Sequence, residues 1–153
     1  MKKQIVIEII SFLFILLFVY AALMKLLDVE KFTVQLGQSP LLMAFAPLIA
    51  WVVPIIELIV AALLIFSRFR LVGLYASFTL MVMFTVYIII VLNLASHVPC
   101  SCGGILEDMN WTQHLIFNIW FVLLSVAGIT LMDKQEKEMN NPQPAVNEMN
   151  YVS

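Results

Sequence analysis

Four long apolar stretches, separated by short polar segments, make up most of the chain. They cover residues 5–27, 44–66, 71–95 and 111–132. Each reaches the length of about 20 residues that an α-helix needs to cross the hydrocarbon core of a bilayer. The pattern therefore predicts an all-α integral membrane protein, a four-helix bundle whose transmembrane domain covers residues 5–132.

The segments between the apolar stretches predict different structures. Residues 26–42 mix charged and apolar side chains, which indicates a short amphipathic segment along the membrane surface. The turn at 67–70 is so short that the second and third spans must form an antiparallel hairpin. Pro47 and Pro54 lie within the second stretch, so we expect that helix to be kinked or discontinuous. Residues 133–153 are polar and predict a disordered cytoplasmic tail.

Composition identifies the solvent of this protein. Of 153 residues, 63% are hydrophobic and only 12% are charged. A chain of this length cannot bury that much apolar surface in one soluble core, so its environment is the lipid bilayer. The net charge of −2 excludes the basic surface that a nucleic-acid-binding protein needs.

Lysine and arginine are distributed unequally between the two sides of the predicted bundle. Four spans put both termini and the 67–70 turn on one side. That side carries Lys2, Lys3, Arg68, Arg70, Lys134 and Lys137, and the other side carries Lys25 and Lys31. The positive-inside rule then predicts cytoplasmic termini and an external loop between the third and fourth spans. The first stretch is too long for the apolar region of a signal peptide and lacks a convincing cleavage site, so we interpret it as a retained span.

The external loop contains both cysteines of the chain, in the sequence Pro-Cys-Ser-Cys-Gly-Gly at 99–104. A bond between Cys100 and Cys102 would close a ring of only about three residues and would contribute almost no stability through chain entropy. Such a bond is strained and easily reduced, which suits a disulfide that cycles between its two states. His97 is placed to lower a thiol pKa or to act as a base. These residues are the candidate site for thiol–disulfide exchange.

Two alternatives for the cysteines stay open. Free cysteines often pack as small apolar residues. The set of His97, Cys100, Cys102 and His114 is also a plausible group of soft ligands for Cu(I) or zinc, although the Cys-x-Cys spacing is not the Cys-x-x-Cys spacing of structural zinc sites.

Glu57 is the ionisable residue deepest in the predicted membrane. It precedes Arg68 by a helix length of roughly 16 Å, which places it near the middle of the bilayer. A carboxyl group there is by default a functional hypothesis, and the alternative is that it bonds backbone disturbed by Pro54. The charged partner that we expect for Glu57 is Lys25, which lies near the outer rim, about ten or more Å higher along the membrane normal. A direct pair needs either a kink that shifts the second span or a lysine side chain that reaches downward.

Three further polar side chains are expected near the cysteine loop. His114 and Asn118 start the fourth span on one helical face, and Asn93 ends the third span at a similar depth. A histidine at a membrane interface is commonly just a satisfied polar residue, so His114 is weighed against that alternative.

Two segments and the cysteine motif together resemble a known group of membrane proteins. Residues 21–28, with Lys25, and residues 54–57, ending in Glu57, resemble the N-terminal pattern of DoxX-like four-helix membrane proteins. The motif at 100–104, followed by a fourth span, resembles the MauE branch of that group, the redox-associated proteins named for methylamine utilisation. The resemblance covers about residues 5–132 and leaves the tail outside.

The resemblance implies a multi-pass protein of the bacterial inner membrane, similar in outline to membrane thiol oxidoreductases. It also implies a role in maturing periplasmic enzymes, notably the disulfide-rich small subunit of methylamine dehydrogenase. The expected partner is a periplasmic thioredoxin-like protein or a disulfide-containing client. No residue pattern in the chain itself points to an amine as substrate.

The preferred hypothesis is that Cys100 and Cys102 exchange electrons with such a partner while His97 or His114 tunes thiolate formation. Electrons passed onward need a membrane acceptor such as a quinone, for which Glu57 and Lys25 are candidate contacts. The competing hypothesis is a non-enzymatic metal-handling or assembly subunit of a membrane complex, and a purely structural subunit is the third.

Overall fold

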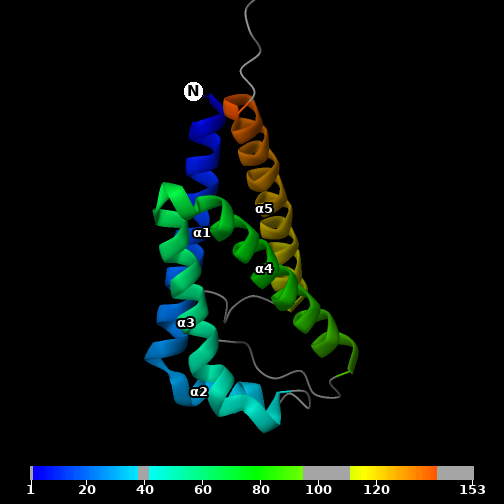
Figure 1. Ribbon diagram of the computed structural model, residues 1–153. Coiled ribbons are helices and arrows are strands. Elements are labelled where there is room, and N and C mark those ends of the chain that lie inside the picture. The colour runs from blue at the N-terminus through cyan, green and yellow to red at the C-terminus, as the bar shows by residue number, and fades with distance from the viewer. Residues whose placement is uncertain (1, 38–41, 95–110, 141–153) are drawn as a thin grey trace, which may run out of the picture.

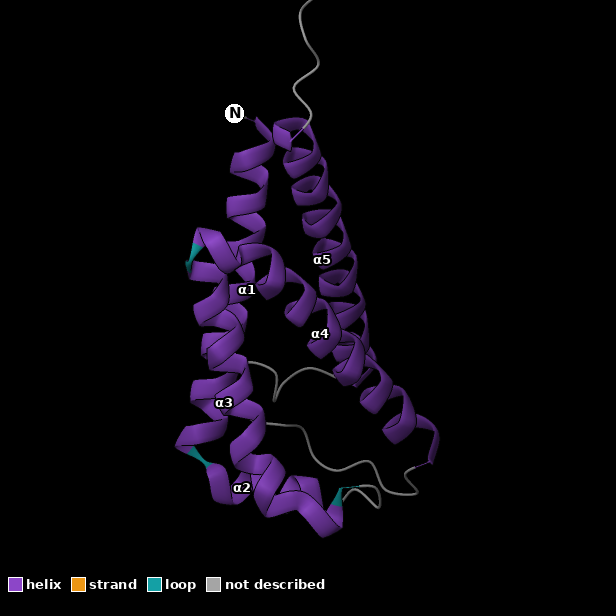
Figure 2. Ribbon diagram, viewed as in Figure 1, coloured by secondary structure: helices purple, strands orange, loops and turns teal. Residues whose placement is uncertain are grey.

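The computed structural model describes residues 2–37, 42–94 and 111–140, and every element in them is helical (Figures 1 and 2). The elements are α1 (Lys2–Leu27), α2 (Val29–Gly37), the 3-10 turn η1 (Met43–Phe45), α3 (Ala46–Ile65), the 3-10 turn η2 (Ser67–Phe69), α4 (Arg70–Leu94) and α5 (Trp111–Asn140). The stretches Lys3–Leu27, Met43–Ile65, Ser67–Ile90 and Thr112–Glu138 are each long and apolar enough to cross a membrane. The prediction of an all-α protein with four membrane-spanning helices is therefore confirmed.

The outer surface of the bundle is apolar. Large side chains such as Phe12 on α1 and Trp120 on α5 are more than half exposed. Exposed apolar surface on every long helix is what a bilayer solvates and water does not. The lipid environment expected from composition therefore agrees with the packing.

Two helix pairs form the bundle. α1 packs mainly against α3, and α4 packs mainly against α5, while α1 also contacts α5 (Figure 1). The turn η2 reverses the chain between α3 and α4, as the short 67–70 segment predicts. A central cluster of aromatic and aliphatic side chains joins the two pairs. Its buried members are Ile10, Phe14, Phe18, Val60, Ala61, Leu64, Leu74, Met81 and Ile129.

α2 is the amphipathic segment that the sequence predicts, and it packs on α3. Its buried residues Phe32 and Leu36 form a second apolar cluster with Ala46 and Ala50 in the first half of α3. Asp28, the residue between α1 and α2, accepts a hydrogen bond from the Phe32 amide at 3.0 Å, so the two helices follow each other almost directly. The first half of α3 therefore packs against α2, and α1 packs against the rest of α3.

α3 corrects the expectation of a broken helix. Pro47 lies in its first turn, where a missing N–H removes no helical hydrogen bond. Pro54 lies inside the helix and is buried, yet α3 is continuous from Ala46 to Ile65. The predicted discontinuity is therefore wrong, and a kink at Pro54 stays a prediction. α3 contacts α1, α2 and α4, and contacts with neighbouring helices allow a membrane helix to tolerate an internal proline.

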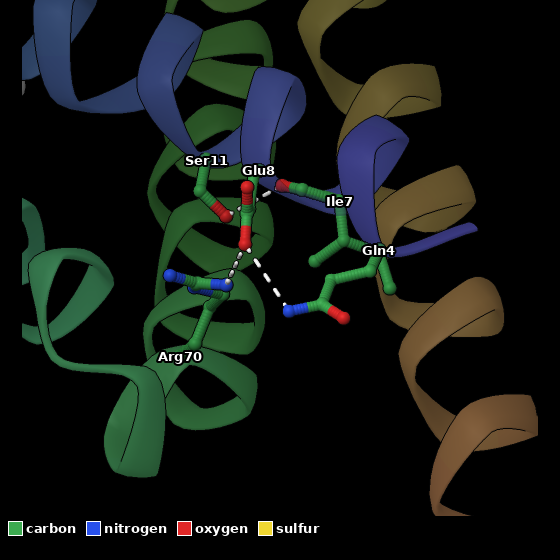
Figure 3. Close-up of polar contacts among 5 residues, drawn as sticks. All are labelled: Gln4, Ile7, Glu8, Ser11 and Arg70. Atoms are coloured by element: carbon green, nitrogen blue, oxygen red, sulfur yellow. Dashed lines mark hydrogen bonds and ion pairs between the residues drawn. The ribbon is translucent and has the colours of Figure 1, made fainter. Parts of the chain in front are cut away.

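Both described ends of the chain lie at the same end of the bundle (Figure 1). Lys3 Nζ on α1 lies 2.7 Å from Glu138 Oε1 on α5. Close to this end, Arg70 Nη1 lies 4.0 Å from Glu8 Oε1, to which Gln4 also donates a hydrogen bond at 3.4 Å (Figure 3). Polar contacts thus join α1, α4 and α5 around the termini.

α5 corrects the predicted start of the tail. The sequence suggests disorder from residue 133, but the helix continues to Asn140. The added residues include good helix formers such as lysine, glutamine and glutamate, and Glu138 gains an ion pair with α1. Residues 141–153 of the predicted tail lie outside the described residues.

Candidate functional site

The buried carboxyl group of Glu57 lies in the middle of α3. Only 1% of the residue is exposed, and its Oε1 accepts a hydrogen bond from Lys25 Nζ, with which it forms an ion pair. Among the described residues Oε2 has no hydrogen-bond partner, although it is fully buried. The interpretation in which Glu57 bonds the backbone near Pro54 therefore does not describe its main contact, which is to α1.

Lys25 lies in the last turn of α1, where a positive charge is also favoured by the helix dipole. The sequence places it about ten or more Å above Glu57 along the membrane normal, and the ion pair shows that the two charged groups nevertheless meet. The physical reason is the position of α2, which occupies the first half of α3 and leaves the end of α1 opposite its middle. The side chain is 21% exposed, so the pair can be reached from the lysine side and not from the glutamate side.

Two aromatic rings enclose the ammonium group of Lys25. Its Nζ lies 5.8 Å from the ring centre of Phe32 on α2 and 5.3 Å from that of Phe84 on α4. Both distances are within the range of cation–π attraction, which is strongest where water is excluded. The positive charge is thus stabilised by a carboxylate and by two aromatic rings from three different helices.

Four helices contribute to this arrangement. Lys25 on α1 contacts Phe32 on α2, Glu57 on α3 and Phe84 on α4, and we call these four residues the polar centre. His114 lies in the first turn of α5 and is half-buried, and no hydrogen bond or ion pair joins it to these four residues among the described contacts.

Asn118 and Asn93 behave differently from each other. Asn118 follows His114 by one turn on the same face of α5 and is buried, and its Nδ2 has no hydrogen-bond partner among the described residues. Asn93 is exposed and donates to the Ile89 carbonyl of its own helix at 2.7 Å. That bond satisfies Asn93 within α4 and does not join it to the polar centre.

The cysteine motif lies outside the described residues. Cys100, Cys102 and His97 belong to residues 95–110, which connect the end of α4 to the start of α5. Of the four candidate metal ligands only His114 is described, and the described ranges contain no group of three or more metal-ligating side chains. Both the exchange site and the metal site therefore stay predictions.

Sequence reasoning singled out Lys25, Glu57 and His114 but missed the two rings around the lysine. Phe32 carries a usable signal, because it lies on the apolar side of an amphipathic segment that follows Lys25 directly. Phe84 carries none, since it is one of 11 phenylalanines in a chain whose lipid-facing helices are rich in them.

The polar centre has the chemistry of a recognition site for an uncharged polar group. An ion pair is neutral as a unit, which is the condition under which two charges persist in a membrane interior. It still offers directional bonding, because an ammonium has three N–H donors and a carboxylate has two acceptor oxygens. The unpartnered Glu57 Oε2 and Asn118 Nδ2 add one acceptor and one donor to the buried interior.

Comparisons with known proteins identify one family. The comparison with curated proteins and the comparison with solved structures found no match. The model of the family described as methylamine utilisation protein MauE matches residues 3–131. That match covers all four membrane-spanning helices except the last part of α5, and it confirms the resemblance suggested by the cysteine motif and the Lys25 and Glu57 segments. The chain is a multi-pass membrane protein that belongs to the MauE family.

Proposed function

We propose that this protein is a membrane thiol–disulfide redox protein that supports the maturation of extracytoplasmic proteins. The observation that carries the proposal is the Cys-Ser-Cys motif in the connection between two membrane-spanning helices of a MauE family member. A disulfide in so small a ring contributes little to stability, so a redox role explains the pair better than a structural one.

The described helices support exchange at one particular end of the bundle. The ion pair of Lys3 with Glu138 lies near the end of α5, and the residues that connect to the cysteines lie at its start. A helix of this length separates the two ends by the thickness of a bilayer. The positive-inside rule assigns the termini to the cytoplasm, so Cys100 and Cys102 face the oxidising side of a bacterial inner membrane.

The proposed step is a reversible exchange between two dithiol–disulfide pairs. A thiolate of one protein attacks a disulfide sulfur of the other, displaces the second sulfur as a thiolate and forms a mixed disulfide. The remaining thiol of the first protein then resolves the mixed disulfide. Two electrons and two protons have passed from one pair to the other, and His97 or His114 is the group that would assist thiol deprotonation.

Thiol trapping tests this proposal directly. Cys100→Ala and Cys102→Ala each leave one cysteine that can attack but cannot resolve, so we expect one of them to accumulate a mixed disulfide with an extracytoplasmic partner. The adduct should disappear on treatment with reductant, and it should be absent from the matched control in which both cysteines are alanine. Its partner is expected to be a thioredoxin-like protein or a client that acquires disulfides.

Two outcomes would overturn the redox proposal. One is that neither single variant forms an adduct and that the wild-type thiols keep one oxidation state under both oxidant and reductant. The other is that a metal ion co-purifies with the wild type and is lost in both variants, which would favour the metal-handling alternative and an assembly role instead of an enzyme.

A further inference from the structure

The proposed exchange reaction does not account for the buried polar groups inside the bundle. A carboxylate oxygen and an amide nitrogen are buried in the bundle without hydrogen-bond partners among the described residues, at Glu57 Oε2 and Asn118 Nδ2. Leaving such groups unsatisfied is unfavourable, and more so in a membrane than in a soluble core. Of these two atoms, Glu57 Oε2 belongs to the polar centre, so the centre offers a bound molecule an acceptor that no described residue uses.

We propose that the polar centre binds the carbonyl head group of a membrane quinone. The proposal rests on the proposed function, because an exchange protein that repeatedly oxidises its partner must itself be reoxidised. The required co-reactant accepts two electrons and two protons and is soluble in the bilayer that surrounds these helices.

The donors and acceptors of the centre fit both redox forms of such a molecule. A quinone oxygen accepts hydrogen bonds, which the ammonium of Lys25 can donate. A hydroquinone hydroxyl donates, and the unpartnered Glu57 Oε2 is an acceptor for it. The aromatic rings of Phe32 and Phe84 stabilise the positive charge of Lys25. Unlike an oxygen acceptor, they do not occupy its N–H donors, which can therefore bond to a ligand.

The exposure of the two charged residues indicates the direction of access. The side chain of Lys25 is 21% exposed, whereas that of Glu57 is 1% exposed. A head group therefore meets the lysine first and has the carboxylate behind it. Apolar side chains cover the surrounding helices, so the apolar tail of the ligand can remain in the bilayer.

The overall reaction balances. The dithiol of Cys100 and Cys102 becomes a disulfide and releases two electrons and two protons, and the quinone takes up both to become a hydroquinone. The new disulfide is reduced again by the dithiol of the extracytoplasmic partner. Electrons then flow from the client through the loop cysteines to the membrane, and the protein acts as a net donor of disulfides.

Competitive photocross-linking measures binding without redox chemistry. The full chain with Cys100→Ala and Cys102→Ala is purified in detergent and labelled with a photoreactive short-chain benzoquinone, with an unmodified quinone as competitor. We expect saturable labelling on peptides of α1, α3 or α5. Lys25→Met and Glu57→Gln should weaken the competitor's apparent affinity by about tenfold or more, because each removes a charged hydrogen-bonding group.

Control variants separate binding from folding. Lys137→Met and Glu30→Gln make the same chemical changes at exposed positions and should leave affinity unchanged. The double variant Lys25→Met/Glu57→Leu carries no buried charge and should fold without binding.

The results distinguish this inference from the proposed function. Labelling that is not competed, or affinity that is unchanged in Lys25→Met and Glu57→Gln, would overturn the quinone site. If the quinone does not bind but the mixed disulfide still forms in Cys102→Ala or Cys100→Ala, the exchange function is supported and only the quinone site is wrong. If quinone binds as described but no mixed disulfide forms, the exchange function falls and the site stands.

Discussion

At the scale of single residues, the main feature is that two charged side chains share one site inside a membrane protein. Each charge alone would carry a large desolvation penalty, and Glu57 is almost completely buried. The pairing with Lys25 makes the site neutral, and Phe32 and Phe84 further stabilise the ammonium. An ion pair of this kind is nevertheless weak evidence for stability, because an apolar pair of similar size often does equally well. The presence of this ion pair inside the bundle therefore favours a function.

A double-substitution cycle tests whether the pair acts as one unit. Lys25→Met and Glu57→Leu each leave one uncompensated charge, and we expect each to lower the free energy of unfolding by about 3 kcal/mol. The double variant Lys25→Met/Glu57→Leu removes both charges and should regain most of that loss. Thermal unfolding in lipid nanodiscs measures the three values. A double variant as unstable as the sum of the single variants would show that the two residues are energetically independent.

At the scale of elements, the hairpin of α3 and α4 depends on a residue without a side chain. A Cβ atom at Gly73 would lie 2.8 Å from Leu64 Cδ2 and 3.1 Å from the Leu64 backbone nitrogen on α3. The side chain could move away but the backbone cannot without shifting the helix. Small residues at such positions let membrane helices pack closely, which here compensates for the absence of a hydrophobic driving force between helices in lipid.

Alanine at this glycine should therefore destabilise the hairpin. We expect Gly73→Ala to lower the free energy of unfolding by about 1–3 kcal/mol, as overpacking of a close contact does. Gly128→Ala should have a smaller effect, because its Cβ would meet only side-chain atoms of Ile10 and Leu74, at 3.2 Å. Gly37→Ala is the matched control, since nothing lies within 4 Å of its Cβ. Equal melting temperatures for Gly73→Ala and Gly37→Ala would contradict the packing argument.

At the scale of the whole molecule, the bundle has two chemically distinct ends. Ion pairs of Lys3 with Glu138 and of Arg70 with Glu8 lie near the described termini. The turn between α3 and α4 lies toward the same end, whereas α2 and the start of α3 lie toward the other (Figure 1). The distribution of basic residues predicts that the first end faces the cytoplasm.

Side-specific labelling checks this orientation. In the background without Cys100 and Cys102, single cysteines are introduced as Ser67→Cys, Glu136→Cys and Met43→Cys, all at exposed positions. With a membrane-impermeant maleimide on intact cells, we expect Met43→Cys to react, and Ser67→Cys and Glu136→Cys to react only after permeabilisation. Labelling of Ser67→Cys in intact cells would invert the topology and place the cysteine loop in the cytoplasm.

The number and order of the membrane-spanning helices follow from the sequence alone. A bilayer offers no water to the backbone, so an apolar stretch of sufficient length has to form a helix whatever its neighbours are. The candidate charged residues also follow from the sequence, because Glu57 and Lys25 interrupt otherwise apolar segments.

Only the tertiary structure decided how these residues meet. Depth counted along each helix separately put Lys25 near the rim, whereas the docking of α2 on the first half of α3 puts it beside Glu57. Phe84 joins the polar centre only because α4 crosses the bundle at that height. The continuation of α5 beyond residue 132 likewise accompanies a contact with α1. Spans are determined locally by transfer from water to lipid, but their relative register is determined by side-chain packing between segments far apart in the chain.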